Sequence, residues 1–201
     1  MSKTESAITL KGSADIVTEF FDYGINSIIY QRGIYPVESF SREEKYGLTV
    51  LMTKNEELRS FITNVTKQLR SWLLTKDVHR LVVVISDSYT KEPLERWEFQ
   101  IKCEGELDIG GKSKSKDIKE IQKEIRNIIR QITASVSFLP LLDTACMFDV
   151  LLYTNKDITV PDEWADTTAH LIPDCDEVRL SNFSTTVHRI DTAVQYKSAD
   201  D

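Results

Sequence analysis

The sequence predicts an α+β fold in which three long helices pack on one face of a largely antiparallel sheet. Apolar residues recur at helical spacing in three long segments, whereas two neighbouring segments have the pattern of an antiparallel hairpin. The strands do not alternate strictly with the helices, which argues against a parallel α/β sheet. With 201 residues, of which 41% are hydrophobic, the chain is long enough for one domain with a substantial core.

The first two helices are predicted from stripes of large apolar residues. One is expected over residues 13–30, and the other over the apolar row at 58–73. Thr53 and Glu56 have the spacing of a capping box at the start of the second helix. The acidic pair at 43–44 is expected at an exposed helix start, where carboxylates complement the helix dipole.

The middle of the chain predicts the sheet and the third helix. Residues 78–86 are apolar on both faces, as expected of a central strand that is covered on both sides. Residues 94–103 alternate and follow a turn-rich stretch, so the two segments are expected to form an antiparallel hairpin. A polar linker precedes a helix at 117–137, and residues 145–154 have the pattern of another strand.

The C-terminal segment after residue 154 is more fragmented. Strand-like pieces at 158–160, 178–188 and 193–196 alternate with acidic turns. This segment is too hydrophobic to be disordered and too fragmented to be a domain, so it must pack on the rest of the chain. Its last ten residues, Thr192–Asp201, are expected to add little to the core and to pin the segment in place as a terminal strand.

The charge of the chain is acidic overall and unevenly distributed. The net charge of -7 argues against bulk binding to nucleic acid or to an anionic membrane. Residues 112–130 are basic and residues 131–201 acidic, so the basic helix could steer a partner, hold the acidic region, or be an ordinary solvated face. Three widely spaced cysteines favour a reducing intracellular compartment.

Candidate catalytic and cofactor motifs are weak. Gly110–Ser113 resembles the end of a phosphate-binding loop, but Glu106 occupies the position that requires the first glycine. The histidines have no zinc-ligand spacing among themselves or with cysteine. A Cys146–His188 dyad would need the fold to join two distant segments. The sequence therefore predicts a non-enzymatic protein with no cofactor or metal, and a cysteine hydrolase is the alternative from another class.

The predicted strand at 145–154 offers a different kind of site. An exposed edge strand presents unpaired backbone N–H and C=O groups, to which an extended peptide can add as a further strand. The hydrophobic segment after residue 154 could cover this edge or move aside. The residues alone leave both a fixed and a mobile segment open.

Several stretches of the sequence carry a specific resemblance to a known family. They are GSADIVTEFFDYGINSIIYQRGIYP at 12–36, LVVVIS at 81–86, LERWEF at 94–99, IRNIIRQITASVSFLPLL at 125–142 and VRLSNFSTTVH at 178–188. These stretches are similar to the HORMA-domain family, and more narrowly to its spindle assembly checkpoint proteins of the mitotic-arrest-deficient type. The match is collinear from about Ile8 to Tyr196.

The resemblance implies a single HORMA domain over residues 8–197. It divides into a core at 8–154 and a mobile C-terminal safety belt at 155–197, with flexible termini at 1–7 and 198–201. In the family, the safety belt swings across one side of the sheet and traps a partner peptide that pairs with the edge strand. The protein is therefore expected to be an adaptor that switches between open and closed conformers.

The resemblance also assigns roles to individual residues. Peptide binding is expected at Trp72, Ala145, Met147, Phe148, Asp149, Val150, Leu151, Leu152 and Tyr153. The interface between conformers in a homodimer is expected at Arg130, Gln131 and Phe138. The switch and the safety belt are expected to include Leu10, Trp164, Val178, Phe183, His188, Val194 and Tyr196.

The expected partners follow from the same resemblance. They are the coiled-coil checkpoint protein that recruits the family member to kinetochores, the mitotic activator of the anaphase-promoting complex, a checkpoint complex with a kinase-like pseudokinase, and a second copy in the other conformer. Neither nucleic acid nor membrane is expected. The protein would delay anaphase until kinetochores are attached, acting in the nucleus and cytoplasm and at kinetochores and the spindle. A HORMA adaptor of the meiotic-axis or translesion-polymerase type, binding other peptides, is the alternative.

Overall fold

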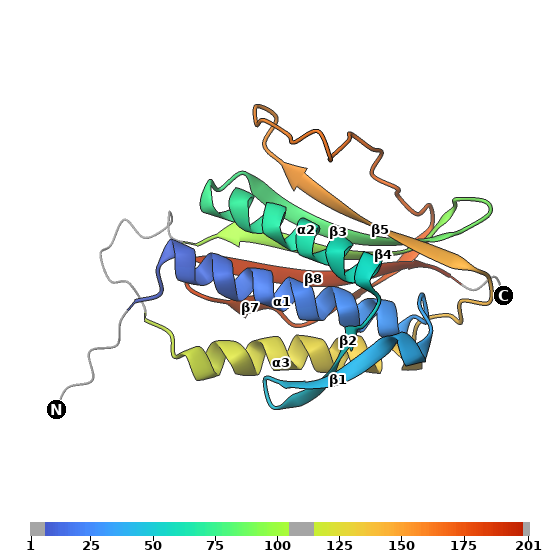
Figure 1. The fold of residues 1–201 in the computed structure, drawn as a ribbon, viewed down its shortest axis with the longest axis horizontal. Coiled ribbons are helices and arrows are strands. Elements are labelled where there is room, and N and C mark those ends of the chain that lie inside the picture. Colours follow the sequence, from blue (N-terminus) through green and yellow to red (C-terminus); the bar gives the residue numbers. More distant parts are fainter. Residues whose placement is uncertain (1–6, 105–114, 199–201) are drawn as a thin grey trace.

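Three helices cover one face of an antiparallel sheet (Figure 1), in a computed structural model that describes residues 7–104 and 115–198. The helices are α1 (Leu10–Gln31), α2 (Glu56–Leu74) and α3 (Ile118–Ala134), with two short 3-10 turns at Val37–Ser39 and Ser135–Ser137. The strands are β1 (Phe40–Lys45), β2 (Leu48–Thr53), β3 (Val78–Asp87), β4 (Pro93–Cys103), β5 (Cys146–Thr154), β6 (Cys175–Arg179), β7 (Phe183–Ser184) and β8 (His188–Lys197). The main sheet has the order β5-β3-β4-β8-β6, and β7 pairs with β8. The predicted α+β class is confirmed.

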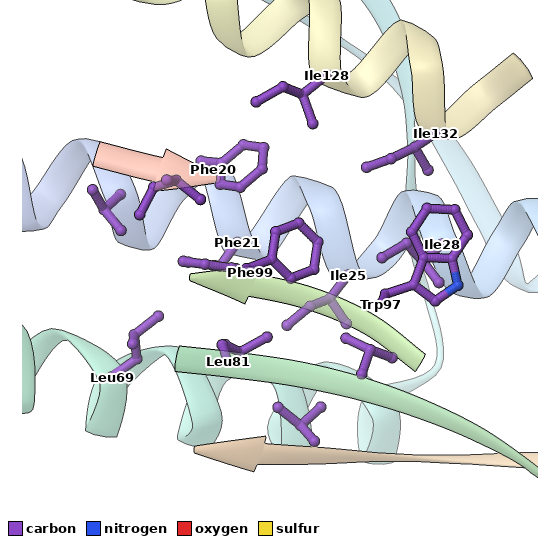
Figure 2. Close-up of a cluster of buried hydrophobic side chains, with 14 of the residues drawn as sticks. Phe20, Phe21, Ile25, Ile28, Leu69, Leu81, Trp97, Phe99, Ile128 and Ile132 are labelled. Atoms are coloured by element: carbon purple, nitrogen blue, oxygen red, sulfur yellow. The ribbon is translucent and has the colours of Figure 1, made fainter. Parts of the chain in front are cut away.

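The core lies between the helices and the inner face of the sheet (Figure 2). The rings of Phe20, Phe21, Phe99 and Phe183 pack at steep angles, with centroids 4.8–5.9 Å apart. Trp97 of β4 is fully buried in the same cluster, which also contains the isoleucine stripe of α3. The periodic apolar stripes of the three helices therefore meet in one core, with α1 packed against both α2 and α3.

Strand β3 is covered on both faces, as predicted. Leu81, Val83 and Ile85 belong to the core under the helices. Val82 and Val84 are equally buried on the outer face, which carries no helix of the described residues, and they pack with Leu151 of β5. Strands β3 and β4 form the predicted antiparallel hairpin.

Two local predictions are wrong because a hairpin precedes α2. Strand β1 pairs with β2 in a separate two-stranded sheet, so the acidic pair at 43–44 lies on an exposed strand rather than at a helix start. Thr53 is the last residue of β2, and the helix cap is Asn55, whose side chain accepts a hydrogen bond from the Leu58 N–H at 2.9 Å. A side-chain cap one residue before the helix satisfies a free N–H without any capping box.

The C-terminal segment departs most from the prediction. Strand β8 lies inside the sheet, between β4 and β6, and Val194 is fully buried opposite Trp97. The prediction that residues 192–201 add little to the core is therefore wrong. The strand expected at 158–160 is absent, and the piece at 178–188 is divided between the end of β6, the short β7 and the start of β8.

Some predictions fall outside the described residues, namely Gly110–Ser113 and most of both termini. Ser198, at the edge of the described part, hydrogen-bonds to Asp176 through its hydroxyl group. Among the residues that are described, no helix is long and apolar enough to cross a membrane, and no three potential metal-binding side chains are grouped.

Candidate functional site

Strand β5 is the outermost strand at one edge of the main sheet. It pairs with β3 along its whole length, from Cys146 opposite Asp87 to Thr154 opposite Val78, and no described residue pairs with its other edge. Such an edge presents backbone N–H and C=O groups that can hydrogen-bond to an extended chain. The prediction of an edge strand at 145–154 agrees with this arrangement.

Residues 155–174 form an irregular segment beside this free edge, which we call the strap. In Figure 1 the strap leaves the arrowhead end of β5 and runs past that strand, on the side away from β3, before it reaches β6. It encloses a hollow of about 700 Å³ together with α2 and β5. A second hollow of about 270 Å³, between β5 and the strap, shares several of the same lining residues. The two hollows adjoin each other along β5, and we call them together the channel.

Three elements line the channel, and their residues are a mixture of apolar and charged side chains. Strand β5 contributes Asp149, Val150, Leu151, Leu152 and Tyr153; α2 contributes Phe61, Asn64, Val65, Lys67, Gln68 and Ser71; the strap contributes residues 163–169. Five of the predicted peptide-binding residues therefore lie on the channel wall. Ala145, Met147 and Phe148 lie toward the start of β5, outside this lining.

The α2 wall was missed by sequence reasoning. Phe61, Asn64, Gln68 and Ser71 repeat at helical spacing on the face of α2 beside its buried row, and Phe61 remains 38% exposed. A large aromatic side chain at the border between the buried row and the polar face was the available signal. The ring of Phe61 contacts Phe148 of β5, with centroids 5.5 Å apart, and so joins helix and strand at one end of the channel.

The strap is attached on the helix side through two tryptophans. Trp164 packs on Trp72 of α2 with ring centroids 5.8 Å apart. Trp72 is 6% exposed and lies behind the channel wall rather than in it. The predicted peptide-binding residue Trp72 and the predicted belt residue Trp164 are thus brought together, and Trp72 contacts the strap directly.

The strap is attached on the outer face through its backbone. The carbonyl oxygen of Ala169 accepts a hydrogen bond from Nε of Arg96, a residue of β4, at 3.2 Å. Between Trp164 and Ala169 the strap therefore passes from the helix side of the sheet, around the free edge of β5, to the outer face. A chain lying along that edge would be enclosed by the strap.

The remaining residues predicted for the switch and the safety belt lie mostly in or beside the C-terminal strands, on the far side of the sheet from β5. Phe183 packs edge to face on Phe20, with ring centroids 4.8 Å apart, and Val178 of β6 pairs with Val194 of β8. Tyr196 is half-buried opposite Glu95. Leu10 is the first residue of α1.

His188 joins the start of β8 to α1. Its Nδ1 lies 2.7 Å from Oγ of Ser13, which also contacts the Thr185 hydroxyl group. Burial lowers the pKa of His188 to about 4, so that the imidazole is neutral at physiological pH. A neutral buried imidazole serves as a structural hydrogen-bonding group between two elements.

The predicted dimer-interface residues lie on and after α3, which Figure 1 shows at the other end of the molecule from β5. Arg130 is exposed, and Phe138 is 39% exposed. Gln131 is engaged within the chain, since its side-chain oxygen accepts a hydrogen bond from the Ser181 N–H at 2.7 Å. The structure thus places this surface apart from the channel and ties it to the C-terminal segment through Gln131.

The Cys146–His188 dyad is contradicted by the sheet register. Cys146 pairs with Asp87 at the turn end of the β3–β4 hairpin, whereas His188 pairs with Cys103 at its open end. Burial also raises the pKa of the Cys146 thiol, which opposes formation of a nucleophilic thiolate. The alternative of a cysteine hydrolase built on these two residues is therefore wrong.

Comparison with known proteins identifies the family. A model described as the HORMA domain matches residues 13–188. The chain belongs to the HORMA-domain family. It is 52% identical to the mitotic spindle assembly checkpoint protein MAD2A of Mus musculus over 194 residues, which cover 96% of this chain and 95% of the relative. It is 51% identical to MAD2A of Homo sapiens over 193 residues, which cover 96% and 94%.

A solved structure of this family shows the same fold. A chain in the crystal structure of the mitotic checkpoint complex superposes with a TM-score of 0.85 and 40% sequence identity, covering 94% of this HORMA protein and all of that chain. The expected resemblance to HORMA proteins of the spindle checkpoint type is confirmed.

Proposed function

We propose that this HORMA protein is a non-enzymatic adaptor that captures an extended peptide by strand addition to β5 and retains it under the strap. The observation that carries the proposal is the free edge of β5 inside a channel closed by the strap. Backbone hydrogen bonds supply affinity in such a mode, and side chains on the wall select the sequence. A peptide enclosed in this way leaves only when the strap detaches or the peptide slides out.

The names of the relatives support a role in the spindle assembly checkpoint. We propose that the captured peptide belongs to the mitotic activator of the anaphase-promoting complex, or to the coiled-coil protein that recruits the adaptor to kinetochores. Assembly with a pseudokinase-containing checkpoint complex and action at kinetochores and the spindle follow from the same proposal. The high identity to MAD2A proteins favours this type over HORMA adaptors of meiotic axes or translesion polymerases.

We further propose that the safety belt, residues 155–197, has a second arrangement in which β8 leaves its place between β4 and β6. The described arrangement encloses the channel, so that a folded partner chain enters only after the C-terminal strands detach. Two arrangements within a few kcal/mol of each other allow one ligand to shift the balance between them. An open and a closed copy would pair through Arg130, Gln131 and Phe138.

A synthetic peptide of the mitotic activator tests the proposed function. The fluorescein-labelled peptide should bind the full chain, dissociate slowly and protect β5 amides from hydrogen exchange. The matched control has the same side chains but N-methyl groups at alternate backbone nitrogens, which removes half of its donors and prevents strand pairing. Equal binding of both peptides, or protection elsewhere than β5, would contradict strand addition.

Replacing Trp72 should loosen the strap. In Trp72→Ala the Trp164 ring loses its partner on α2, so the peptide should bind about tenfold more weakly, a loss larger than the lower melting temperature explains. Leu69→Ala is the control, because Leu69 is fully buried in the same core and on the same helix but is not the residue that packs on Trp164. Unchanged peptide affinity in folded Trp72→Ala, measured by fluorescence anisotropy, would show that Trp72 acts only in the core.

Replacing Arg130 should weaken self-association and spare peptide capture. Arg130 is exposed on α3, away from the channel, and an interface arginine that is a hot spot contributes about 2 kcal/mol or more. Arg130→Ala should therefore shift the dimer dissociation constant by at least about tenfold in sedimentation velocity. Lys123→Ala, an exposed change on the same helix, is the control. An unchanged dimer in Arg130→Ala would remove this residue from the interface.

A further inference from the structure

Arg96 occupies an unusual place on the outer face of the sheet. Its neighbours on β4, Glu95 and Trp97, point into the core between the sheet and the helices. Arg96 therefore points to the face that carries no helix, where an alternating strand would expose it to water. Its side chain is nevertheless only 1% exposed.

Four different segments of the chain meet at the Arg96 guanidinium. Nε donates to the carbonyl oxygen of Ala169 in the strap at 3.2 Å. One Nη donates to Gln195 of β8 at 2.8 Å and to Glu98 of β4 at 3.2 Å. The other Nη lies 3.3 Å from the hydroxyl oxygen of Tyr153, a channel-lining residue of β5.

The burial of this guanidinium coincides with the crossing of the strap. Val82 and Val84 are buried on the same outer face, where Ala169 reaches Arg96. A buried guanidinium requires hydrogen-bond acceptors and a compensating charge, and here the charge is the Glu98 carboxylate. Arg96 thus depends on the strap for one acceptor, and the strap depends on Arg96 for its fixed position on this face.

The backbone of the strap is constrained next to this contact. His170, which follows Ala169, has φ 46°, a left-handed conformation that non-glycine residues seldom adopt. Its ring nitrogen Nε2 lies 3.1 Å from the Thr167 hydroxyl group. A strained turn persists only where neighbouring contacts hold it, and the hydrogen bond to Arg96 is one such contact.

We propose that Arg96 is a positioning residue that clasps the strap to the outer face and couples its closure to β5 through Tyr153. The inference rests on the proposed function, because the clasp sets how long a peptide on β5 remains enclosed. Loss of the clasp would free the strap between Trp164 and β6 without removing any residue from the channel wall. The clasp would therefore govern the dissociation rate of the peptide more than its sequence selectivity.

Hydrogen–deuterium exchange of the peptide-free protein tests the clasp. In Arg96→Gln, amides of residues 155–174 should exchange at least tenfold faster than in the unmodified protein. The amides of β3 and of the helices should remain protected relative to one another as they are in the unmodified protein. Arg179→Gln is the matched control, since Arg179 is 86% exposed on β6 and pairs with Glu177 on its own strand. Arg96→Lys keeps the charge beside Glu98 but cannot span Ala169 and Gln195, so it should give an intermediate rate.

The release of the labelled activator peptide supplies the second readout. Arg96→Gln should release it at least tenfold faster, and Tyr153→Phe, which removes only one contact, a few-fold faster. Unchanged strap exchange in folded Arg96→Gln or Arg96→Lys would overturn the clasp. If the unmodified protein binds no peptide, the proposed function fails, and the exchange of the strap still decides the role of Arg96.

Discussion

Deletion of Thr192–Asp201 should abolish the long-lived capture of a peptide. Strand β8 makes nine register pairs with β4, and the deletion removes five of them. It also removes all five pairs with β6, because they fall at residues 193–197 of β8. Each lost backbone hydrogen bond costs about 0.5–1.5 kcal/mol net, and burial of Val194 adds about 1.5–3 kcal/mol. The sum exceeds the few kcal/mol that would separate two conformers, so the enclosed arrangement should be lost.

The truncated chain should stay folded, because the three helices and β3, β4 and β5 lie upstream of the deletion. Activator peptide bound to a surface should dissociate about 100-fold faster or more from this variant. The unfolding of the variant, followed by far-ultraviolet circular dichroism, should remain cooperative. Removal of residues 199–201 alone is the matched control and should leave release slow. Retention of the peptide by the longer deletion would show that β8 does not hold the safety belt closed.

Replacement of Glu95 should give a large loss of folding stability. Its carboxylate accepts hydrogen bonds from Nε and Nη2 of Arg32, at the end of α1, at 2.6–3.1 Å, and both side chains are buried. Nη2 of Arg32 also donates to the carbonyl oxygen of Pro140 at 2.6 Å, and Trp97 Nε1 donates to Glu95. The pair thus ties α1, β4 and the segment before β5 together.

Removing one partner leaves the other charge buried and uncompensated, which costs about 3–5 kcal/mol. Glu95→Ala should therefore lower the free energy of unfolding in urea by this amount, whereas Arg32→Met with Glu95→Leu should recover much of it. Glu177→Ala removes a partner of the exposed Arg179 and should change stability by less than about 1 kcal/mol. A loss below about 1 kcal/mol in Glu95→Ala would contradict a buried, uncompensated Arg32.

The helices and the central hairpin could be predicted because their signals are local. The apolar stripes determine which face of each helix is buried. A strand such as β3 that is apolar on both faces is expected in the interior of the sheet, where both faces are covered. The β1–β2 hairpin was missed because most of β1 is charged and exposed. Its turn consists of Tyr46 and Gly47, both with positive φ, and only the glycine is a recognisable signal.

The channel could be predicted only in part, because its assembly is non-local. The alternation of apolar and polar residues in β8 is compatible with an edge position or an interior position in the sheet. Only the long-range packing of Val194 against the core selects the interior position. Arg96 has the pattern of an ordinary solvent-facing residue of an alternating strand. Segments far away in the sequence bury it, among them the strap, whose Ala169 lies more than 70 residues later. Neither the interior position of β8 nor the burial of Arg96 can be predicted from a window of local sequence.

The interior position of β8 has a kinetic consequence for partners of different shape. A ligand with a free chain end can thread the channel while every strand of the sheet stays paired. A ligand whose binding segment lies between two folded domains cannot, and in the proposed mechanism it binds only after β8, with or without β6, detaches from β4. For that class the observed association rate reaches a ceiling that extra ligand does not raise. In the proposed function, the rate at which β8 detaches would therefore limit how fast such partners bind, whatever their concentration.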